Sequence, residues 1–453
     1  MSISLIPVTL VSRKSPNNSD CTLEVSNNLC QQLDLNSGQD LSILLGKKMI
    51  KMKIQIIEKP INEITFPENI FHEFYLPIQT YKFQAYYTPE IHTLQLGPIL
   101  GLLTDFEVKE GAEPHFRSIH LFCEELHRAI EEIGGFFYIF SYNHFSKEGY
   151  YYQNGKWIPS MLPLPNVIYN RIHSRRLEYV KEFKKFRQSL EQLNIPLFNE
   201  RFLSKLEVYN QLSEEQHLHA FLPETKLFTF ENLMELAKKY ETVFIKPVHG
   251  SQGRNILKIS KQDENSYSYQ TSFQLTIDAK KYLLDDIYQQ IKPLLGNRIY
   301  IIQQGIPLLT HVGNIMDFRV LCHKNCHHLW EVTSMVARIS AEQEMVSNLA
   351  KGGKVMKPFE ALGTCMNNRK AFEILQLIKE LAIETAATIS KNSQGITGEL
   401  GIDIGVDKDG RLWLIEVNSK PSKSFEDGQG KIRPSAKAIV QLCTLLTFET
   451  SRD

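Results

Sequence analysis

The sequence predicts a multidomain protein of mixed α/β and α+β class, and three observations indicate it. The first 90 or so residues contain short apolar runs separated by turn residues, which is typical of a small β-rich module. From about residue 95, strand-like and helix-like segments alternate, as in a mostly parallel sheet with helical crossovers. Near the C-terminus, two strand-like runs flank Asp409-Gly410, a dipeptide that favours a tight hairpin turn. We therefore expect three units, at residues 1–92, 93–198 and 199–453.

The composition is that of an ordinary globular protein. Its 453 residues suffice for several domains that each bury a core. The 51 Lys+Arg residues balance the 51 Asp+Glu residues, so neither nucleic acid nor an anionic membrane is favoured as the main partner. Seven cysteines without framework spacing predict reduced thiols. We find no signal-peptide pattern and no apolar run long enough for a transmembrane segment, and we expect a soluble cytoplasmic protein.

The first unit carries no pattern that suggests chemistry. Residues 49–57 alternate between apolar and polar side chains, which predicts a half-buried strand. We interpret residues 1–92 as a small β-barrel that serves docking or folding.

The second unit has the pattern of an α/β domain. Residues 98–103, 136–140 and 165–171 are strand candidates, and the last of these ends in Asn170 and Arg171. The carboxyl ends of strands often face a ligand crevice, so both residues are candidates for ligand contacts. For Arg171, a local cap or ion pair is an equally good interpretation.

The third unit begins with a short helix predicted from Lys205, with Ser204 as its N-cap. Further on, a strand ends in Lys246 and runs into the loop Gly250-Ser-Gln-Gly253. Glycines let backbone N–H groups approach phosphate oxygens, and a lysine adds a positive charge to the same group. This is not a Walker A loop, because the lysine precedes the glycines. Taken alone, the pattern also fits a plain loop.

The next strands carry polar side chains that could contact a nucleotide. Residues 298–306 form a strand that runs into a glycine hinge, where a Gln side chain or the backbone could bond a base edge. In the following strand Asp317 and Arg319 share one face, and the returning strand carries Arg338. Solvated amides and surface ion pairs are the alternatives. A polar, glycine-containing loop at residues 347–353 follows.

One cluster has the ligand types of a zinc site. Residues 322–328 contain two cysteines and three histidines at close spacing. They lie where two strands are expected to join, and no second Cys/His pair is found elsewhere. We therefore expect a hairpin turn rather than a zinc site.

The hairpin around Asp409-Gly410 has a predictable register. With a two-residue loop, Asp403 lies directly opposite Glu416, and Asn418 follows on the same face. Two opposed carboxylates repel unless something neutralises them, and two carboxylates with an amide oxygen suit Mg²⁺. A merely solvated polar face is the alternative. The same register predicts three pairs of apolar residues on the core-facing side of the hairpin. They are Ile402 opposite Val417, Ile404 opposite Ile415, and Val406 opposite Trp413.

These motifs, in this order, resemble those of the ATP-grasp superfamily. Three runs, at residues 96–101, 165–171 and 204–209, are more closely similar to the YheC/YheD endospore coat-associated family. The resemblance implies an ATP-grasp fold preceded by a pre-ATP-grasp α/β domain and a small N-terminal β module. It also implies roles for individual residues. ATP would be bound by Lys205, Lys246, Gly250, Ser251, Gly253, Gln303, Gln304 and Ile306. The catalytic residues would be Arg319, Arg338 and Asn348, and the metal ligands Asp403, Glu416 and Asn418.

The function implied by the resemblance is ATP- and Mg²⁺-dependent ligation of a carboxylate to an amine through an acyl-phosphate. The cofactors would be ATP and two Mg²⁺ ions, which Mn²⁺ can replace. The acceptor would be a peptide or a spore coat protein, met in the mother-cell cytoplasm around the developing spore. Two alternatives stay open: a non-catalytic, nucleotide-binding structural or morphogenetic coat protein, and a phosphotransferase.

Overall fold

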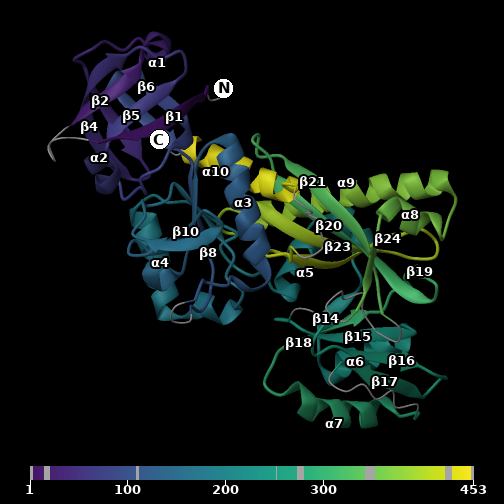
Figure 1. Ribbon diagram of the computed structural model, residues 1–453. Helices are drawn as coiled ribbons and strands as arrows, with labels where there is room; N and C mark the ends of the chain where they lie inside the picture. Colours follow the sequence, from purple (N-terminus) through teal and green to yellow (C-terminus); the bar gives the residue numbers. More distant parts are fainter. Residues whose placement is uncertain are drawn as a thin grey trace.

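The computed structural model describes seven stretches of the chain. They are residues 4–14, 21–108, 112–250, 253–272, 280–341, 352–423 and 431–449. Figure 1 shows an N-terminal barrel at one end, an α/β domain beside it, and two further sheets that stack one above the other. No helix in these stretches is long and apolar enough to span a membrane.

The first seven strands close into a barrel in the order β1-β5-β2-β4-β3-β7-β6, and two short helices, α1 and α2, accompany them. The bounds are β1 Ile6–Arg13, β2 Thr22–Ser26, α1 Asn27–Leu33, β3 Asp40–Leu45, β4 Lys48–Ile57, β5 Glu63–Pro67, α2 Glu68–Glu73, β6 Tyr81–Thr88, 3-10 helix η1 Pro89–Ile91 and β7 Thr93–Gly97.

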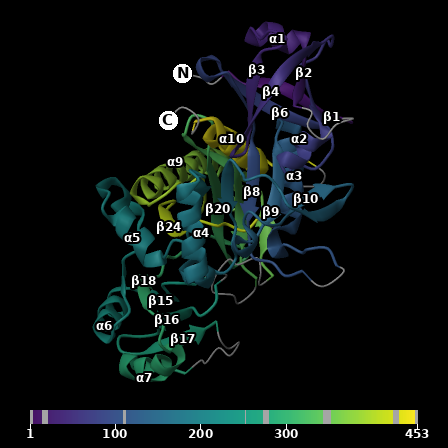
Figure 2. The ribbon, with the colours of Figure 1, turned by 90° about the vertical axis from the view of Figure 1, so that its left-hand side faces the viewer.

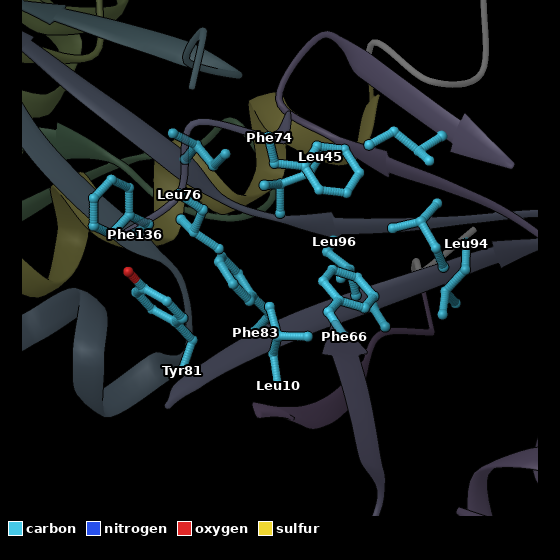
Figure 3. Packing of buried hydrophobic residues seen from close by; sticks show 14 of the residues in the cluster. Leu10, Leu45, Phe66, Phe74, Leu76, Tyr81, Phe83, Leu94, Leu96 and Phe136 are labelled. Atoms are coloured by element: carbon cyan, nitrogen blue, oxygen red, sulfur yellow. The ribbon is translucent and has the colours of Figure 1, made fainter. Parts of the chain in front are cut away.

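The barrel interior is filled by apolar side chains from every strand. Phe66, Phe83 and Leu96 lie together in it, and Tyr81 extends the packing towards Phe136 of the next domain (Figure 3). Along β4, buried and exposed residues alternate, which confirms the half-buried strand predicted at residues 49–57. Because β7 pairs with β3 and β6, the barrel runs to Gly97, beyond the expected boundary at residue 92.

The second domain is a six-stranded sheet in the order β11-β10-β9-β8-β12-β13. Its elements are β8 Ile99–Leu103, η2 Arg117–Ile119, α3 His120–Ile133, β9 Phe136–Phe140, η3 Tyr142–His144, β10 Gly149–Gln153, β11 Lys156–Ser160, β12 Val167–Asn170, η4 Arg175–Tyr179, α4 Lys181–Gln192 and β13 Leu197–Phe198.

Helices cover both faces of this sheet, which explains why β9 is apolar at every position. Phe136, Tyr138 and Phe140 share a core with α4, whereas Phe137 and Ile139 share one with α3. Helix α3 ends at Ile133, and Gly134, the residue after it, has a φ of 102°, which favours glycine.

Strands β8 and β12 are parallel neighbours whose chain connections leave in opposite directions. The chain goes from β8 to β9 on one side, and from β12 to β13 on the other. Such a switch point leaves a crevice outside the carboxyl ends of the two strands.

The remaining chain forms two antiparallel sheets that face each other (Figures 1 and 2). The smaller has the order β14-β18-β15-β16-β17, and the larger the order β22-β21-β20-β23-β24 with β19 paired to β20. The smaller lobe consists of β14 Thr225–Leu227, α6 Phe230–Lys239, β15 Thr242–Pro247, β16 Leu257–Lys261, β17 Tyr267–Thr271, α7 Leu284–Leu295 and β18 Tyr300–Gln304. The larger lobe consists of α5 Lys205–Ser213, η5 Gln216–Phe221, β19 Thr310–His311, β20 Asn314–Lys324, β21 Trp330–Ile339, β22 Lys354–Met356, α8 Pro358–Gly363, α9 Asn368–Asn392, β23 Glu399–Val406, β24 Leu412–Asn418 and α10 Pro434–Glu449.

Helix α10 returns to the second domain and packs beside α3 (Figure 1). Ile439, Val440 and Cys443 share one apolar core with Phe122 and Leu126 of α3. The C-terminal helix therefore joins the third unit to the second.

The hairpin β23–β24 has the predicted pairing at its functional end. Asp403 lies opposite Glu416, and Ile402 lies opposite Val417. The loop, however, is longer than the predicted two residues, because the N–H of Asp407 bonds the carbonyl of Arg411 at 3.0 Å.

The predicted partners of two core residues were wrong for this reason. Ile404 lies opposite Leu414 rather than Ile415, and Val406 lies opposite Leu412 rather than Trp413. A β-bulge at residue 415 absorbs the extra loop residue and restores the register before Asp403.

The Asp407 carboxylate holds this longer loop together. It accepts hydrogen bonds from the backbone N–H groups of Asp409 (3.0 Å) and Arg411 (2.9 Å) and from Nε1 of Trp413 (2.9 Å). Asp407→Ala leaves these three donors without that acceptor, so we expect the free energy of unfolding to fall by about 1–3 kcal/mol. Urea denaturation measures this. Asp409→Ala, at the exposed tip of the same loop, should change it by less than about 0.5 kcal/mol, and equal losses would contradict the role of Asp407.

Candidate functional site

A cavity of about 200 Å³ lies between the two C-terminal sheets. Every described residue to which the family resemblance assigned a nucleotide, catalytic or metal role lines it, from both lobes. These residues are Lys205, Lys246, Gly250, Gly253, Gln303, Gln304, Ile306, Arg319, Arg338, Asp403, Glu416 and Asn418. Ser251 and Asn348, also predicted, lie outside the described residues.

Lys246 reaches the cavity from β15 and bonds the side-chain oxygen of Gln303 at 2.6 Å. The amide nitrogen of Gln303 donates in turn to the hydroxyl of Thr225 at 2.9 Å. Burial, together with the positive charge of Lys205, lowers the pKa of Lys246 to about 8. Through this hydrogen bond Gln303 orients the ammonium of Lys246, a role that the sequence did not suggest.

Because the pKa of Lys246 is about 8, we expect the nucleotide binding predicted at this cavity to depend on pH. If the Lys246 ammonium binds phosphate, Lys246 must be protonated before ATP binds above pH 8. The affinity for ATP should therefore fall by at most about tenfold for each unit by which the pH rises. Calorimetry between pH 7 and 9.5 measures this slope. Lys246→Arg, which stays charged throughout, should remove it, and an unchanged slope would assign it to another group.

Lys205 stands at the first turn of α5, where Ser204 caps the helix by accepting from the N–H of Glu207 at 3.1 Å, as predicted. The ammonium of Lys205 donates hydrogen bonds to the Glu416 carboxylate at 2.6 Å and to the Gly250 carbonyl at 3.2 Å. Lys205 therefore links helix α5, the glycine loop that begins at Gly250, and the β23–β24 hairpin that carries Asp403 and Glu416.

The two predicted metal carboxylates are each neutralised by cations. Asp403 is 4% exposed and receives both Nε and Nη2 of Arg319, while Nη2 of Arg338 lies 3.0 Å from it. Burial alone would raise the pKa of Asp403, but the two guanidinium groups hold it below its usual value. The repulsion expected between Asp403 and Glu416 is thus offset by arginines on one side and by Lys205 on the other.

Arg338 also serves a second carboxylate. Its Nε and Nη2 bond Asp317 at 2.7 and 2.6 Å, across the β20–β21 pair. Although burial favours the neutral form, the carboxylates of Asp317 and Asp403 raise the pKa of Arg338 above its usual value. Asp317 was predicted to share a face with Arg319 but was not predicted to be a site residue.

The donor set fits Mg²⁺. Asp403 and Glu416 are directly opposed and Asn418 follows along the same strand, so hard oxygen atoms gather at one wall of the cavity. In the described part of the chain no group of three or more His, Cys, Asp or Glu side chains could hold a metal ion. Mg²⁺ bound here would take its remaining ligands from phosphate oxygens and water, as it commonly does.

Apolar side chains line the rest of the cavity and suit a flat, uncharged ring. They come from both lobes, and Ile415 is the residue added by the bulge. Periodicity could not place Ile415 here, because the bulge moves it from the core face. The apolar lining residues are Phe244, Ile256, Ile306, Leu308, Ile315 and Ile415.

Asn170 and Arg171 do not line this cavity. Arg171 bonds the carboxylate of Glu399 at 3.2 Å and the carbonyl of Pro421 at 2.8 Å, and Asn170 bonds the Glu200 carbonyl at 2.9 Å. The structure therefore favours the ion-pair interpretation of Arg171, although its partner Glu399 is not local in sequence. The effect of Arg171 is to tie the second domain to strand β23, through Glu399, and to the segment that follows β24, through Pro421.

The Cys/His cluster at residues 322–328 is dispersed by the fold. Cys322 is buried, and His323 reaches Glu399 at 2.9 Å. His328 pairs instead with Glu449 at 2.9 Å. The N–H of Asn325 bonds the carbonyl of Leu329 at 2.9 Å, which closes the expected hairpin turn.

Two facing lobes, a glycine loop, two lysines and an opposed carboxylate pair around one cavity define a protein of the ATP-grasp class. The sequence model of the family described as YheC/D-like ATP-grasp matches residues 194–446, more than half of the chain. The chain belongs to this family.

Two curated relatives come from Bacillus subtilis (strain 168). Endospore coat-associated protein YheD is 28% identical over 402 residues, covering 85% of this chain and 85% of YheD. Endospore coat-associated protein YheC is 22% identical over 312 residues, covering 65% of this chain and 80% of YheC.

Among solved structures, the ATP-grasp ligase PsnB in complex with its minimal precursor has a TM-score of 0.44 and 12% identity, covering 77% of this chain and 99% of PsnB. The D-alanine–D-alanine ligase of Coxiella burnetii has a TM-score of 0.44 and 10% identity, covering 78% of this chain and 96% of the ligase.

Proposed function

We propose that this protein is an ATP- and Mg²⁺-dependent ligase that joins a carboxylate to an amine through an acyl-phosphate. One observation carries the proposal: a single cavity brings two lysines, two arginines and an opposed carboxylate pair together. Membership of the ATP-grasp superfamily, most of whose members are ATP-dependent ligases, supports it.

The pairing of charges suggests how the site accepts its ligand. In the structure, Lys205 neutralises Glu416 and Arg319 neutralises Asp403. Nucleotide phosphates offer these cations new partners, so the carboxylates become free to hold a metal ion. Bound Mg²⁺ would neutralise the charge that develops during phosphoryl transfer.

Individual residues then have distinct tasks. Lys246 and Lys205 hold the phosphates, with backbone N–H groups of the glycine loop close by. Arg319 and Arg338 stabilise charge where the phosphoryl group meets the acceptor carboxylate. Asp403, Glu416 and Asn418 would hold Mg²⁺, and Asn348 would contact the acyl-phosphate. The apolar side chains that line the cavity exclude water from the adenine base of ATP.

Both curated relatives are described as endospore coat-associated. We therefore place the acceptor among peptides or coat proteins, met in the mother-cell cytoplasm around the developing spore.

The test is product analysis. The purified protein is incubated with Mg-ATP, short Asp- and Glu-containing peptides as carboxylates, and hydroxylamine as the amine. We expect ADP, phosphate and peptide hydroxamates, found by mass spectrometry, and none of them with Glu416→Gln. Stable phosphopeptides would instead identify a phosphotransferase.

The coat association of both relatives favours a second candidate, a structural coat protein that binds nucleotide without turnover. It predicts ATP binding with no ADP, either with the peptides or with a spore-coat extract. That result would displace the ligase proposal.

A further inference from the structure

A second cluster of reactive side chains lies away from the nucleotide cavity, at the switch point of the α/β domain. Asp105 follows the end of β8, and His173 follows the end of β12, the neighbouring parallel strand. Ser118 lies on η2, the turn that leads into α3. None of the three lines the nucleotide cavity. Fold topology places ligand sites at such strand ends.

The three side chains are connected in a row. Oδ1 of Asp105 lies 3.3 Å from Nδ1 of His173 and also accepts from the backbone N–H of that residue. Nε2 of His173 lies 3.3 Å from Oγ of Ser118. This is the order carboxylate, imidazole, hydroxyl, and contacts of this length are usual before substrate binds.

The hydrogen-bond network determines which ring nitrogen carries the proton. The hydroxyl of Thr104 donates its proton to the carbonyl of Arg171 at 3.0 Å, so it can only accept from Nδ1 of His173, 3.3 Å away. Asp105 is an acceptor too. In the neutral imidazole, Nδ1 therefore carries the proton, and the lone pair of Nε2 faces the hydroxyl of Ser118, as a general base requires.

Asp105 is held in its charged form. Burial alone would raise the pKa of Asp105, but hydrogen bonds from His173 and the charge of Arg117, whose Nη1 lies 2.9 Å away, keep it below its usual value. The side chains of Asp105 and His173 are 13% and 21% exposed, whereas Ser118 is exposed. The hydroxyl is thus reachable while its partners are shielded.

The turn that presents Ser118 has an unusual backbone. Arg117, immediately before it, has a φ of 51°, in the left-handed region that non-glycine residues rarely adopt. Such conformations cluster at functional sites. The 14-residue helix α3 begins at His120, and its N-terminus favours negative charge developing beside Ser118.

We propose that Ser118 is a nucleophile for acyl transfer, with His173 as its base and Asp105 as the residue that orients His173. The substrates would be esters or thioesters. Ser118 Oγ attacks the acyl carbon while its proton passes to Nε2, and the alcohol or thiol leaves with that proton, which gives an acyl-serine. Water, deprotonated by His173, then releases the carboxylic acid and restores the hydroxyl.

The experiment uses the full-length protein and two probes, a fluorophosphonate that labels activated serines and p-nitrophenyl acetate. The chain offers a matched control in Ser141, whose Oγ lies 2.9 Å from Nδ1 of His144. Among the described residues, no carboxylate bonds that imidazole.

We expect mass spectrometry to find the fluorophosphonate on Ser118 and not on Ser141. Ser118→Ala should abolish labelling and ester hydrolysis, His173→Gln and Asp105→Asn should slow both by at least about tenfold, and Ser141→Ala should change neither. Unfolding temperatures within about 2 °C of the parent protein would show that the variants fold. Absent labelling, equal labelling of both serines, or rates unaffected by His173→Gln would overturn the proposal. ATP plays no part in this test, so it is independent of the ligase proposal.

Discussion

Replacing Glu416 by Gln is expected to reduce the gain in ATP affinity that Mg²⁺ provides, without weakening ATP binding in the absence of metal. Without metal, the substitution frees Lys205 from its 2.6 Å ion pair and removes a negative charge beside the phosphates, so affinity for ATP should stay equal or rise. With Mg²⁺, a proposed metal ligand is lost, and the gain in affinity that Mg²⁺ provides should fall by at least about tenfold. Calorimetry with ATP, with Mg²⁺ or with EDTA, measures both effects.

Two further variants complete this experiment. Asp403→Asn removes the second carboxylate and should reduce the Mg²⁺ gain as Glu416→Gln does. Asp409→Asn, at the exposed tip of the same hairpin, should leave it unchanged. A Mg²⁺ gain equal to that of the parent protein in both site variants would show that the metal is bound elsewhere.

Replacing Arg338 by Met is expected to destabilise the larger lobe strongly. Arg338 is 7% exposed, and its guanidinium neutralises Asp317 and Asp403, which are also buried. Removing one member of a buried ion-pair network leaves charges without compensation and costs about 3–5 kcal/mol of the free energy of unfolding. Urea denaturation of the variant measures this loss.

A second substitution tests the cause of the loss. In Arg338→Met the buried Asp317 loses its bidentate partner, whereas Asp403 keeps Arg319. Adding Asp317→Asn removes the charge of that carboxylate and should recover part of the stability. Arg369→Met, whose parent side chain is 91% exposed beside Glu373, should cost less than about 1 kcal/mol. If the double variant is no more stable than Arg338→Met, the loss comes from packing rather than charge.

Local pattern and the family resemblance together located most of the candidate site. Strand periodicity put Asp403 opposite Glu416 and placed Asp317 and Arg319 on one face, since side chains alternate along any strand. Glycines and lysines at strand ends marked Lys246 and the loop after it. These inferences needed residues close in sequence, or a hairpin whose register could be counted, and the described members of the set do line one cavity.

Pairings between distant segments were beyond that reasoning. The arginines could be placed on their strands, but nothing local showed that Arg319 and Arg338 would both bind Asp403. Likewise, the interpretation of Arg171 stayed open until the fold brought Glu399 beside it, 228 residues along the chain.

The sequence by itself determined the class of fold, the order of the motifs and the opposition of the two hairpin carboxylates. Each follows from spacing along the chain, because strand geometry and turn preference act over a few residues. Tertiary structure decided the bulge that brings Ile415 to the cavity, the return of α10 to α3, and the meeting of Ser118, His173 and Asp105. These depend on packing between segments far apart in sequence, and no local period encodes which partner a side chain will meet.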